Sequence, residues 1–216
     1  MRTLSRPLAI VLALTGMGTL AWCGITLAWG EPFTAVSAAR SQAALSSELA
    51  RKEASGNQAS GKRAGRHGAT NGLVAGAREP MHEGDAVGRL VVPRLDLSAV
   101  VVEGTRSADL SRGPGHYRKT SLPGSGAVVA IAGHRTTYGR PFRHIDDLEP
   151  GDRIVLKMPY GTYRYVVYAH RIVDDHDWSI LRPRSFEKLV LTACHPLYSA
   201  AQRYVVFARL RSGPLT

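Results

Sequence analysis

The sequence has 216 residues, of which 28 are Lys or Arg and 17 are Asp or Glu, so the chain carries a formal net charge of +11 at pH 7. This length predicts one globular domain with appended segments. Two cysteines exclude a framework of several disulfide bonds. The basic excess favours contact with anionic surroundings such as phospholipid head groups or polyanionic wall polymers, although a basic solvated surface would give the same composition.

The first 30 residues (1–30) have the pattern of a cytoplasmic tip followed by a transmembrane anchor. Residues 8–29 contain no charged side chain, and a helix of about 20 apolar residues spans a hydrocarbon core of about 30 Å. The alternative is a cleaved signal peptide, whose apolar core is usually shorter, at about 7–15 residues. Arg2 and Arg6 precede the run. They predict a single-pass protein of the cell membrane with a cytoplasmic N-terminus and an extracytoplasmic remainder.

Residues 31–85 are predicted to form a flexible extracytoplasmic stalk. Residues 37–54 are rich in helix-forming residues but poor in apolar ones, and residues 55–70 are dominated by Gly, Ser, Asn, Lys and Arg. A segment with so little apolar surface does not bury enough of it to offset the entropy lost on ordering. We therefore expect a tether that gives the following domain reach from the membrane.

From residue 86 to residue 216 the sequence changes to short β-rich runs separated by turns. The spacing of these runs predicts an all-β domain, built as a closed or nearly closed β-barrel with short helices. The runs lie at residues 88–92, 97–102, 127–134, 153–158, 163–173, 187–194 and 204–210.

Two of these runs end in reactive side chains. One delivers Cys194 to a strand end, where Pro196 then prevents further central pairing because it has no N–H group. Another ends at His134, and a third begins near Arg203. Cysteine attacks as a thiolate, and a nearby guanidinium favours that thiolate and stabilises a developing oxyanion. The three residues are therefore candidates for an acyl-transfer site.

His195 is the histidine nearest to Cys194 in sequence, but we expect it to be a poor base. Successive strand residues point to opposite faces, so Thr192 shares the face of Cys194 whereas His195 does not. A base from another strand is needed, and His134 is the best candidate. By the same alternation, Arg135 should point away from the face of His134. A buried, inert cysteine is the alternative interpretation of Cys194.

Other polar residues add candidates of a weaker kind. Tyr138 and Tyr198, which follow the His134 and Cys194 runs, could line a substrate groove together with Thr192, or be plain surface aromatics. The His and Asp residues at 170–177 match no zinc or calcium ligand spacing, so no metal site is predicted.

The strings at 132–135 (Ala-Gly-His-Arg) and 191–194 (Leu-Thr-Ala-Cys), with Arg203 beyond them, resemble the motifs of the sortases, the cysteine transpeptidases of cell surfaces. The longer strings at 133–139 and 192–196 are most similar to the class E pattern, with Ala193 where class E members usually have Thr. The resemblance covers roughly residues 86–211 and implies an eight-stranded barrel.

The resemblance also implies a mechanism. Cys194 would attack a Leu-Ala/Pro-x-Thr-Gly type sorting signal of a surface protein between Thr and Gly, His134 would transfer protons, and Arg203 would stabilise the oxyanion. The acyl group would pass to an amine of a peptidoglycan precursor or a pilin, without a cofactor. An exported cysteine hydrolase and a non-enzymatic surface module remain alternatives. Nucleic acid is not an expected partner, because the domain should face outward and lacks an interleaved aromatic–basic platform.

Overall fold

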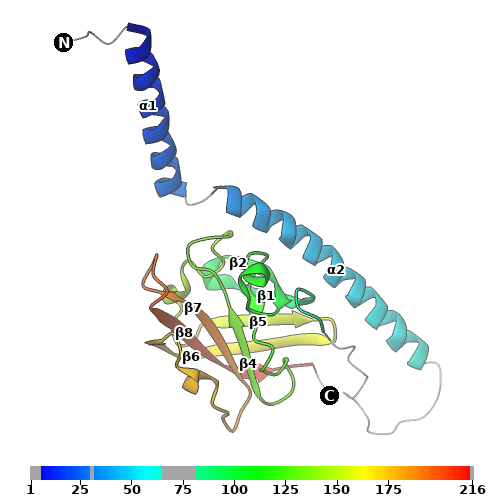
Figure 1. Cartoon of the computed structure of the whole chain (residues 1–216). Helices are drawn as coiled ribbons and strands as arrows, with labels where there is room; N and C mark the ends of the chain where they lie inside the picture. The colour runs from blue at the N-terminus through cyan, green and yellow to red at the C-terminus, as the bar shows by residue number, and fades with distance from the viewer. Residues whose placement is uncertain (1–5, 30–31, 65–80, 215–216) are drawn as a thin grey trace.

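The computed structural model describes residues 6–29, 32–64 and 81–214. Two long helices, α1 (Arg6–Trp29) and α2 (Pro32–Ala64), precede a β domain (Figure 1). Its eight strands close into a barrel in the order β1-β2-β3-β4-β7-β8-β6-β5, which confirms the predicted all-β barrel. The strands are β1 (Ala86–Val92), β2 (Leu97–Glu103), β3 (Gly115–His116), β4 (Val128–Ala132), β5 (Arg153–Met158), β6 (Gly161–Asp174), β7 (Lys188–His195) and β8 (Gln202–Ser212). The short helices are η1 (Pro93–Leu95), α3 (Ser107–Leu110), η2 (Ile145–Asp147) and η3 (Trp178–Leu181).

The barrel mixes parallel and antiparallel pairs. β4 and β7 run parallel, while β7 pairs antiparallel with β8 and β8 with β6. All five residues of β4 are buried, as are the first six residues of β7. Continuous apolar runs of this kind suit parallel strands that are covered on both faces. Between β2 and β3, by contrast, the ladder contains only two residue pairs.

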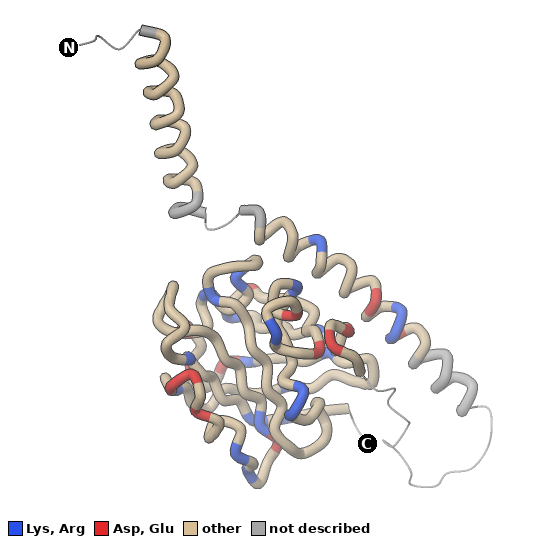
Figure 2. Tube along the Cα trace, in the orientation of Figure 1, with Lys and Arg blue, Asp and Glu red and all other residues tan. Residues whose placement is uncertain are grey.

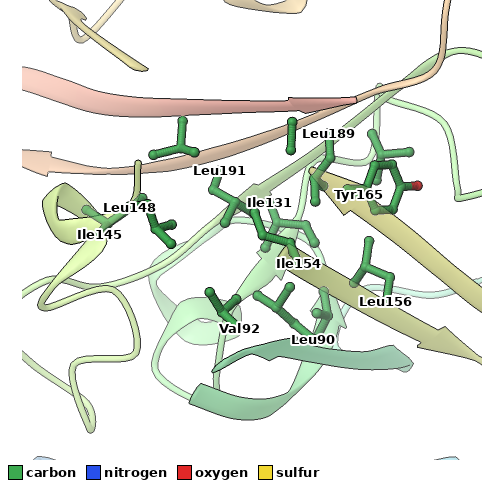
Figure 3. Close-up of a cluster of buried hydrophobic side chains, with 14 of the residues drawn as sticks. Leu90, Val92, Ile131, Ile145, Leu148, Ile154, Leu156, Tyr165, Leu189 and Leu191 are labelled. Carbon is green, nitrogen blue, oxygen red and sulfur yellow. The ribbon is translucent and has the colours of Figure 1, made fainter. Parts of the chain in front are cut away.

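Side-chain alternation divides the apolar residues between two faces of the barrel wall. The inward side chains of several strands interdigitate in the barrel interior (Figure 3), among them Leu90, Ile131, Ile154, Leu189 and Leu191. The outward side chains form a second cluster, which is covered in part by η3 and the neighbouring loop. Its buried members are Val128, Ala130, Val173, Ile180, Val190, Val205 and Phe207.

Helix α1 is long and apolar enough to cross a membrane. The qualifying segment is Pro7–Ile25, and none of it is buried against the rest of the chain. Within Pro7–Ile25, Figure 2 shows neither basic nor acidic residues. Since a signal sequence has the same features, the helix is consistent with either a membrane anchor or a signal sequence.

The structure corrects the expectation of a flexible stalk over residues 34–55. These residues belong to α2, and part of this helix packs on the barrel. Leu45 is 0% exposed and Leu49 is 2% exposed, in a cluster with Val100 and residues of β1 and β2. The remainder of the predicted stalk at residues 65–80 lies outside the described residues.

Polar side chains of α2 bind backbone groups at the edge of the barrel. The Oε1 atom of Gln42 accepts from the N–H of Val100 at 2.7 Å, and its Nε2 atom donates to the carbonyls of Val100 at 3.0 Å and Arg112 at 2.8 Å. Glu48 and Lys52 similarly bind the N–H and carbonyl of Ala86. Because the β2–β3 ladder is short, α2 satisfies backbone groups that this edge would otherwise leave open.

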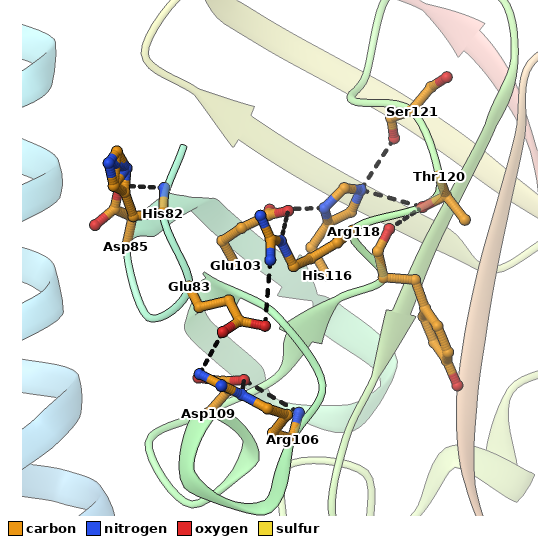
Figure 4. A network of polar contacts seen from close by, with 11 residues as sticks. His82, Glu83, Asp85, Glu103, Arg106, Asp109, His116, Arg118, Thr120 and Ser121 are labelled. Carbon is orange, nitrogen blue, oxygen red and sulfur yellow. Dashed lines mark hydrogen bonds and ion pairs between the residues drawn. The ribbon is translucent and has the colours of Figure 1, made fainter. Parts of the chain in front are cut away.

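A polar network, buried at His116 and Glu103 and partly exposed at Glu83 and Arg106, lies beside β2 and β3 (Figure 4). The Nδ1 atom of His116 is 2.8 Å from the carboxylate of Glu103, and its Nε2 atom is 3.1 Å from the carbonyl of Ser121. Nearby, Glu83 forms an ion pair with Arg106 at 2.5 Å. The network therefore ties the chain that enters β1 to the segments that follow β2.

Candidate active site

The register of β4 and β7 relates the predicted cysteine to the predicted histidine. Ala132 lies opposite Thr192 in the parallel ladder, and the N–H of Gly133 donates to the carbonyl of Thr192 at 3.0 Å. Two residues further on, His134 and Cys194 reach the same level of adjacent chain segments. Neighbouring strands are about 4.8 Å apart, so two parallel backbones bring an imidazole and a thiol into one region.

Close packing fixes the turn that carries His134. A Cβ atom at Gly133 would lie 2.5 Å from the ring of Phe142, which is fully buried. The N–H of Phe142 donates to the carbonyl of His134 at 3.0 Å. This approach requires glycine at position 133, and it holds the backbone of His134 against the core.

Arg203 comes to the same region from the other side of β7. It is the direct partner of Cys194 in the antiparallel ladder between β7 and β8. One guanidinium nitrogen of Arg203 donates to the carbonyls of Ala200 at 2.7 Å and Gln202 at 3.0 Å. These bonds fix one corner of the guanidinium beside the strand end that carries the thiol.

The segment from His134 to Arg143 contains two buried nitrogens that lack a hydrogen-bond partner among the described residues, His134 Nε2 and Arg143 Nη1. Buried polar atoms are nearly always hydrogen-bonded. Burial lowers the pKa of His134 below its usual value, because desolvation disfavours the charged ring. The described residues therefore leave the hydrogen-bonding capacity of both atoms unused.

The two candidate tyrosines contact residues at the two ends of this segment. The ring of Tyr138 lies 5.1 Å from the ring of His134, centroid to centroid. Tyr198 is 79% exposed in the loop after β7, and the guanidinium carbon of Arg143 lies 5.5 Å from its ring centroid. Sequence reasoning missed Arg143, since no periodicity or motif distinguishes it from the other arginines.

Thr192 occupies a different position from the tyrosines. Its side chain is on a residue that is only 1% exposed, and its hydroxyl lies 2.9 Å from the hydroxyl of Tyr117. Tyr117 was also missed, because its link to Thr192 joins residues far apart in the sequence. Thr192 therefore lies beneath the surface, where its hydroxyl contacts Tyr117.

Arg135 and His195, the residues that follow the two candidates, contact each other. The Nη1 atom of Arg135 is 3.2 Å from the Nδ1 atom of His195, and its Nη2 atom is 2.5 Å from the carboxylate of Asp146. Arginine can only donate hydrogen bonds, so Nδ1 of His195 accepts in this pair. The guanidinium also lies 5.8 Å from the ring centroid of Tyr204. These contacts form a separate layer that braces the ends of β4 and β7.

The acidic and histidine-rich segment at 170–177, which covers the end of β6 and the following turn, contains a short contact between His176 and Asp175 at 2.5 Å. Within the described ranges, no group of three or more His, Cys, Asp or Glu side chains is arranged to hold a metal ion.

Comparison with known proteins gives the family. Residues 90–211 match the model of the sortase domain. The chain is 35% identical over 130 residues to sortase D of Bacillus subtilis, and 32% identical over 156 residues to sortase SrtE1 of Streptomyces coelicolor. These matches cover 58% and 62% of this chain. They cover 64% and 44% of the two relatives, so the chain spans less than two thirds of their length.

Solved structures agree with this result at the level of the fold. Sortase E1 of Streptomyces coelicolor, determined with a tripeptide in the active site, has a TM-score of 0.58 and 29% identity, and the match covers 62% of this chain and 93% of that one. The sortase D5 transpeptidase of Clostridium perfringens has a TM-score of 0.58 and 26% identity, with coverage of 62% and 84%. Relatives of both class D and class E are thus similar to this chain, which belongs to the sortase family.

Proposed function

We propose that this protein is a membrane-anchored cysteine transpeptidase that acts on sorting signals, with Cys194 as nucleophile, His134 as proton carrier and Arg203 as oxyanion donor. Family membership supports the reaction class. The observation that carries the residue assignment is the register around β7. Arg203 pairs directly with Cys194 in the β7–β8 ladder, and the β4–β7 ladder ends at the pair Ala132–Thr192, two residues before His134 and Cys194.

The proposed reaction has two halves. The Cys194 thiolate attacks the signal's carbonyl carbon, the C–N bond breaks, and the His134 imidazolium gives its proton to the departing amine. The neutral imidazole of His134 then takes a proton from the incoming amine, which attacks the thioester, forms the new amide bond and releases the Cys194 thiolate. Arg203 holds the carbonyl oxygen through a planar fork of donors as negative charge develops there.

We propose a Leu-Ala/Pro-x-Thr-Gly type signal, cut between Thr and Gly, and an acceptor amine from a peptidoglycan precursor or a pilin. The support is the class E character of the strings at 133–139 and 192–196. Tyr138 and Tyr198 would border the groove for this signal. Arg143 joins them, because its unpartnered nitrogen could donate to a peptide carbonyl. Thr192 would act through the hydroxyl of Tyr117.

We further propose a single membrane span at residues 8–29, a cytoplasmic N-terminus and an extracytoplasmic barrel (86–216). The charge-free run at residues 8–29 and the preceding Arg2 and Arg6 support this orientation. Protease added to intact cells should remove the barrel and leave the anchor. Full protection would mean the opposite orientation, and a free mature domain in the medium would mean a cleaved signal.

The function is tested on the full chain in neutral detergent with a library of sorting peptides and added amines, followed by mass spectrometry. Cys194→Ala should abolish both cleavage and the acyl-enzyme. His134→Ala should reduce the rate by about 10²–10⁴-fold, which is the usual contribution of a positioned general acid or base to the rate. Arg203→Lys should reduce it by about 10²–10³-fold, because lysine keeps the charge but loses the planar fork.

His195→Ala is the matched control for His134→Ala, with folding checked by circular dichroism. Its effect should be much milder, since His195 contacts Arg135 in the separate layer. A folded His195→Ala variant that is the more damaged of the two would contradict the assignment of His134. Hydrolysis that never responds to added amines would favour a cysteine hydrolase. A native Cys194 that resists thiol-specific probes would favour a non-enzymatic module.

A further inference from the structure

A basic pocket of about 420 Å³ lies on the outer face of the barrel. It is formed by β6, β8, the first residue of β7 and the loop that contains η3. Three arginines and one lysine line the pocket together with His170. No Asp or Glu side chain of the described residues lines it. The four are Arg171, Arg182, Arg184 and Lys188.

This pocket is distinct from the candidate active site. Lys188 is the first residue of β7, whereas Cys194 lies near the end of that strand. A rise of about 3.3 Å per residue places them about 20 Å apart along the strand. Between them lies the outer apolar cluster, in which Val190 packs with Ile180. A molecule in the basic pocket would therefore not occupy the place of the sorting signal beside Cys194.

Lys188 contributes a buried positive charge to this pocket. The residue is 3% exposed, and its ammonium donates to the carbonyls of Ile180 and Arg182, both at 2.8 Å. Within the described part of the chain, no carboxylate lies within ion-pair distance of it. Burial, with the nearby charges of Arg184 and Arg171, lowers the pKa of Lys188. Hydrogen bonds to backbone carbonyls solvate the ammonium of Lys188. They do not cancel the positive electrostatic potential that Lys188 and the neighbouring arginines create together.

The other cations are only slightly neutralised. Arg171 donates to the hydroxyl of Ser179 at 3.3 Å and lies 3.8 Å from Asp177, a carboxylate at the border of the pocket. Arg182 and Arg184 are exposed. Neither forms an ion pair with any residue that the structure describes. One carboxylate, that of Asp177, thus faces four cationic side chains. The guanidinium groups of Arg182 and Arg184 remain free to donate hydrogen bonds to a ligand.

We propose that this pocket binds an anion of the phosphate class. Arginine forks match phosphate oxygens in bidentate geometry, and Lys188 adds a fixed charge behind them. The volume exceeds that of a single phosphate group, so a pyrophosphate or a phosphate-bearing head group fits the pocket better. The proposal goes beyond the transpeptidase function and does not depend on the thiol chemistry.

The test uses the full chain in neutral detergent and inorganic pyrophosphate as the probe, measured by isothermal titration calorimetry. The variant Arg182→Ala/Arg184→Ala should weaken binding at least 10-fold, because it removes both free forks. Arg94→Ala/Arg153→Ala is the matched control: both arginines are exposed, lie outside the pocket and carry the same total charge. This control should bind pyrophosphate as the wild type does.

Two results would overturn the proposal. In one, the wild-type chain does not bind pyrophosphate. In the other, the two double variants lose binding equally, which would indicate a general surface-charge effect.

A second experiment identifies the source of the phosphate. The chain is placed in nanodiscs of phosphatidylcholine with or without phosphatidylglycerol. Competition by the anionic lipid for the pyrophosphate site supports a lipid head group, and unchanged affinity supports a soluble or polymeric phosphate.

Discussion

At the scale of single residues, the burial of His134 determines the resting chemistry of the site. Its Nε2 atom has no partner among the described residues, and desolvation lowers its pKa. The neutral ring is therefore favoured near pH 7 even more than in a free histidine, whose pKa is about 6.5. In the proposed reaction, this neutral imidazole is the form of His134 that takes a proton from the incoming amine.

The depressed pKa of His134 predicts how stability depends on pH. The folded chain binds this proton less readily than the unfolded chain does, so the histidine contributes stability above its unfolded pKa of about 6.5. That contribution should be lost as pH falls through the lower folded pKa. NMR titration of His134 in the Cys194→Ala variant should give a midpoint below 6.5.

Comparison with His134→Gln isolates this effect. Chemical denaturation of the full chain between pH 7 and pH 5 should show an acid-induced loss of stability that is smaller in His134→Gln than in the parent. A His134 midpoint above 6.5, or identical pH profiles for both proteins, would contradict the desolvated environment described here.

Strand alternation predicted some of the candidate site correctly and left other parts out of reach. It predicted that His195 points away from the face of Cys194, and in the structure His195 contacts Arg135. Periodicity is a local property, so it could reveal neither the bond of Thr192 to Tyr117 nor the unpartnered nitrogen of Arg143. Both depend on which loops the tertiary fold brings together.

At the scale of elements, α2 shows where sequence reasoning failed. Its buried side of Ala38, Leu45 and Leu49 has helical spacing, with Gln42 between them. Judged by its amino-acid composition alone, the segment is too polar to fold by itself, and for this reason we expected a tether. The helix is instead stabilised by what it covers, the sparsely paired edge of β2. A polar side chain can belong to a packing face when it binds open backbone groups.

Substitutions on α2 should therefore destabilise the barrel. Leu45→Ala should reduce the free energy of unfolding by about 2–5 kcal/mol, the usual cost of truncating a buried leucine. Gln42→Ala should reduce it by about 1–3 kcal/mol, because it leaves the backbone groups of Val100 without partners. Chemical denaturation of the full chain, followed by circular dichroism, measures both.

Arg51→Ala is the control for these changes, since Arg51 lies on the exposed side of the same helix. It should alter stability by no more than about 0.5 kcal/mol. If all three variants unfold at the same denaturant concentration as the wild type, α2 does not stabilise the barrel and the packing described here is incorrect.

The strands themselves were more predictable than their order. β4 and β7 stand out in the sequence as apolar runs between turn residues. Their parallel pairing, which brings His134 and Cys194 to one level, follows from neither run alone. An apolar run can pair on either side and in either direction, and closure of the whole barrel selects among these arrangements.

At the scale of the whole molecule, α2 links α1 to the candidate active site. From Trp29, where α1 ends, to Thr34 the chain advances five residues, at most about 18 Å when fully extended. The hydroxyl of Thr34 accepts from the N–H of Tyr138 at 3.2 Å, in the turn that follows His134. If α1 spans the membrane as proposed, this turn is held close to the membrane surface.

This geometry predicts which end of the barrel faces the bilayer. Ser125 precedes β4 and Arg140 follows it, so the strand separates the two positions by about 17 Å or more. In a Cys23→Ser/Cys194→Ala background in nanodiscs, a fluorophore on Arg140→Cys should transfer more energy to labelled lipid head groups than one on Ser125→Cys. Gln42→Ala should reduce this difference, because it weakens the attachment of α2. Equal transfer from both positions, or stronger transfer from Ser125→Cys, would mean that the active-site end of the barrel does not face the membrane.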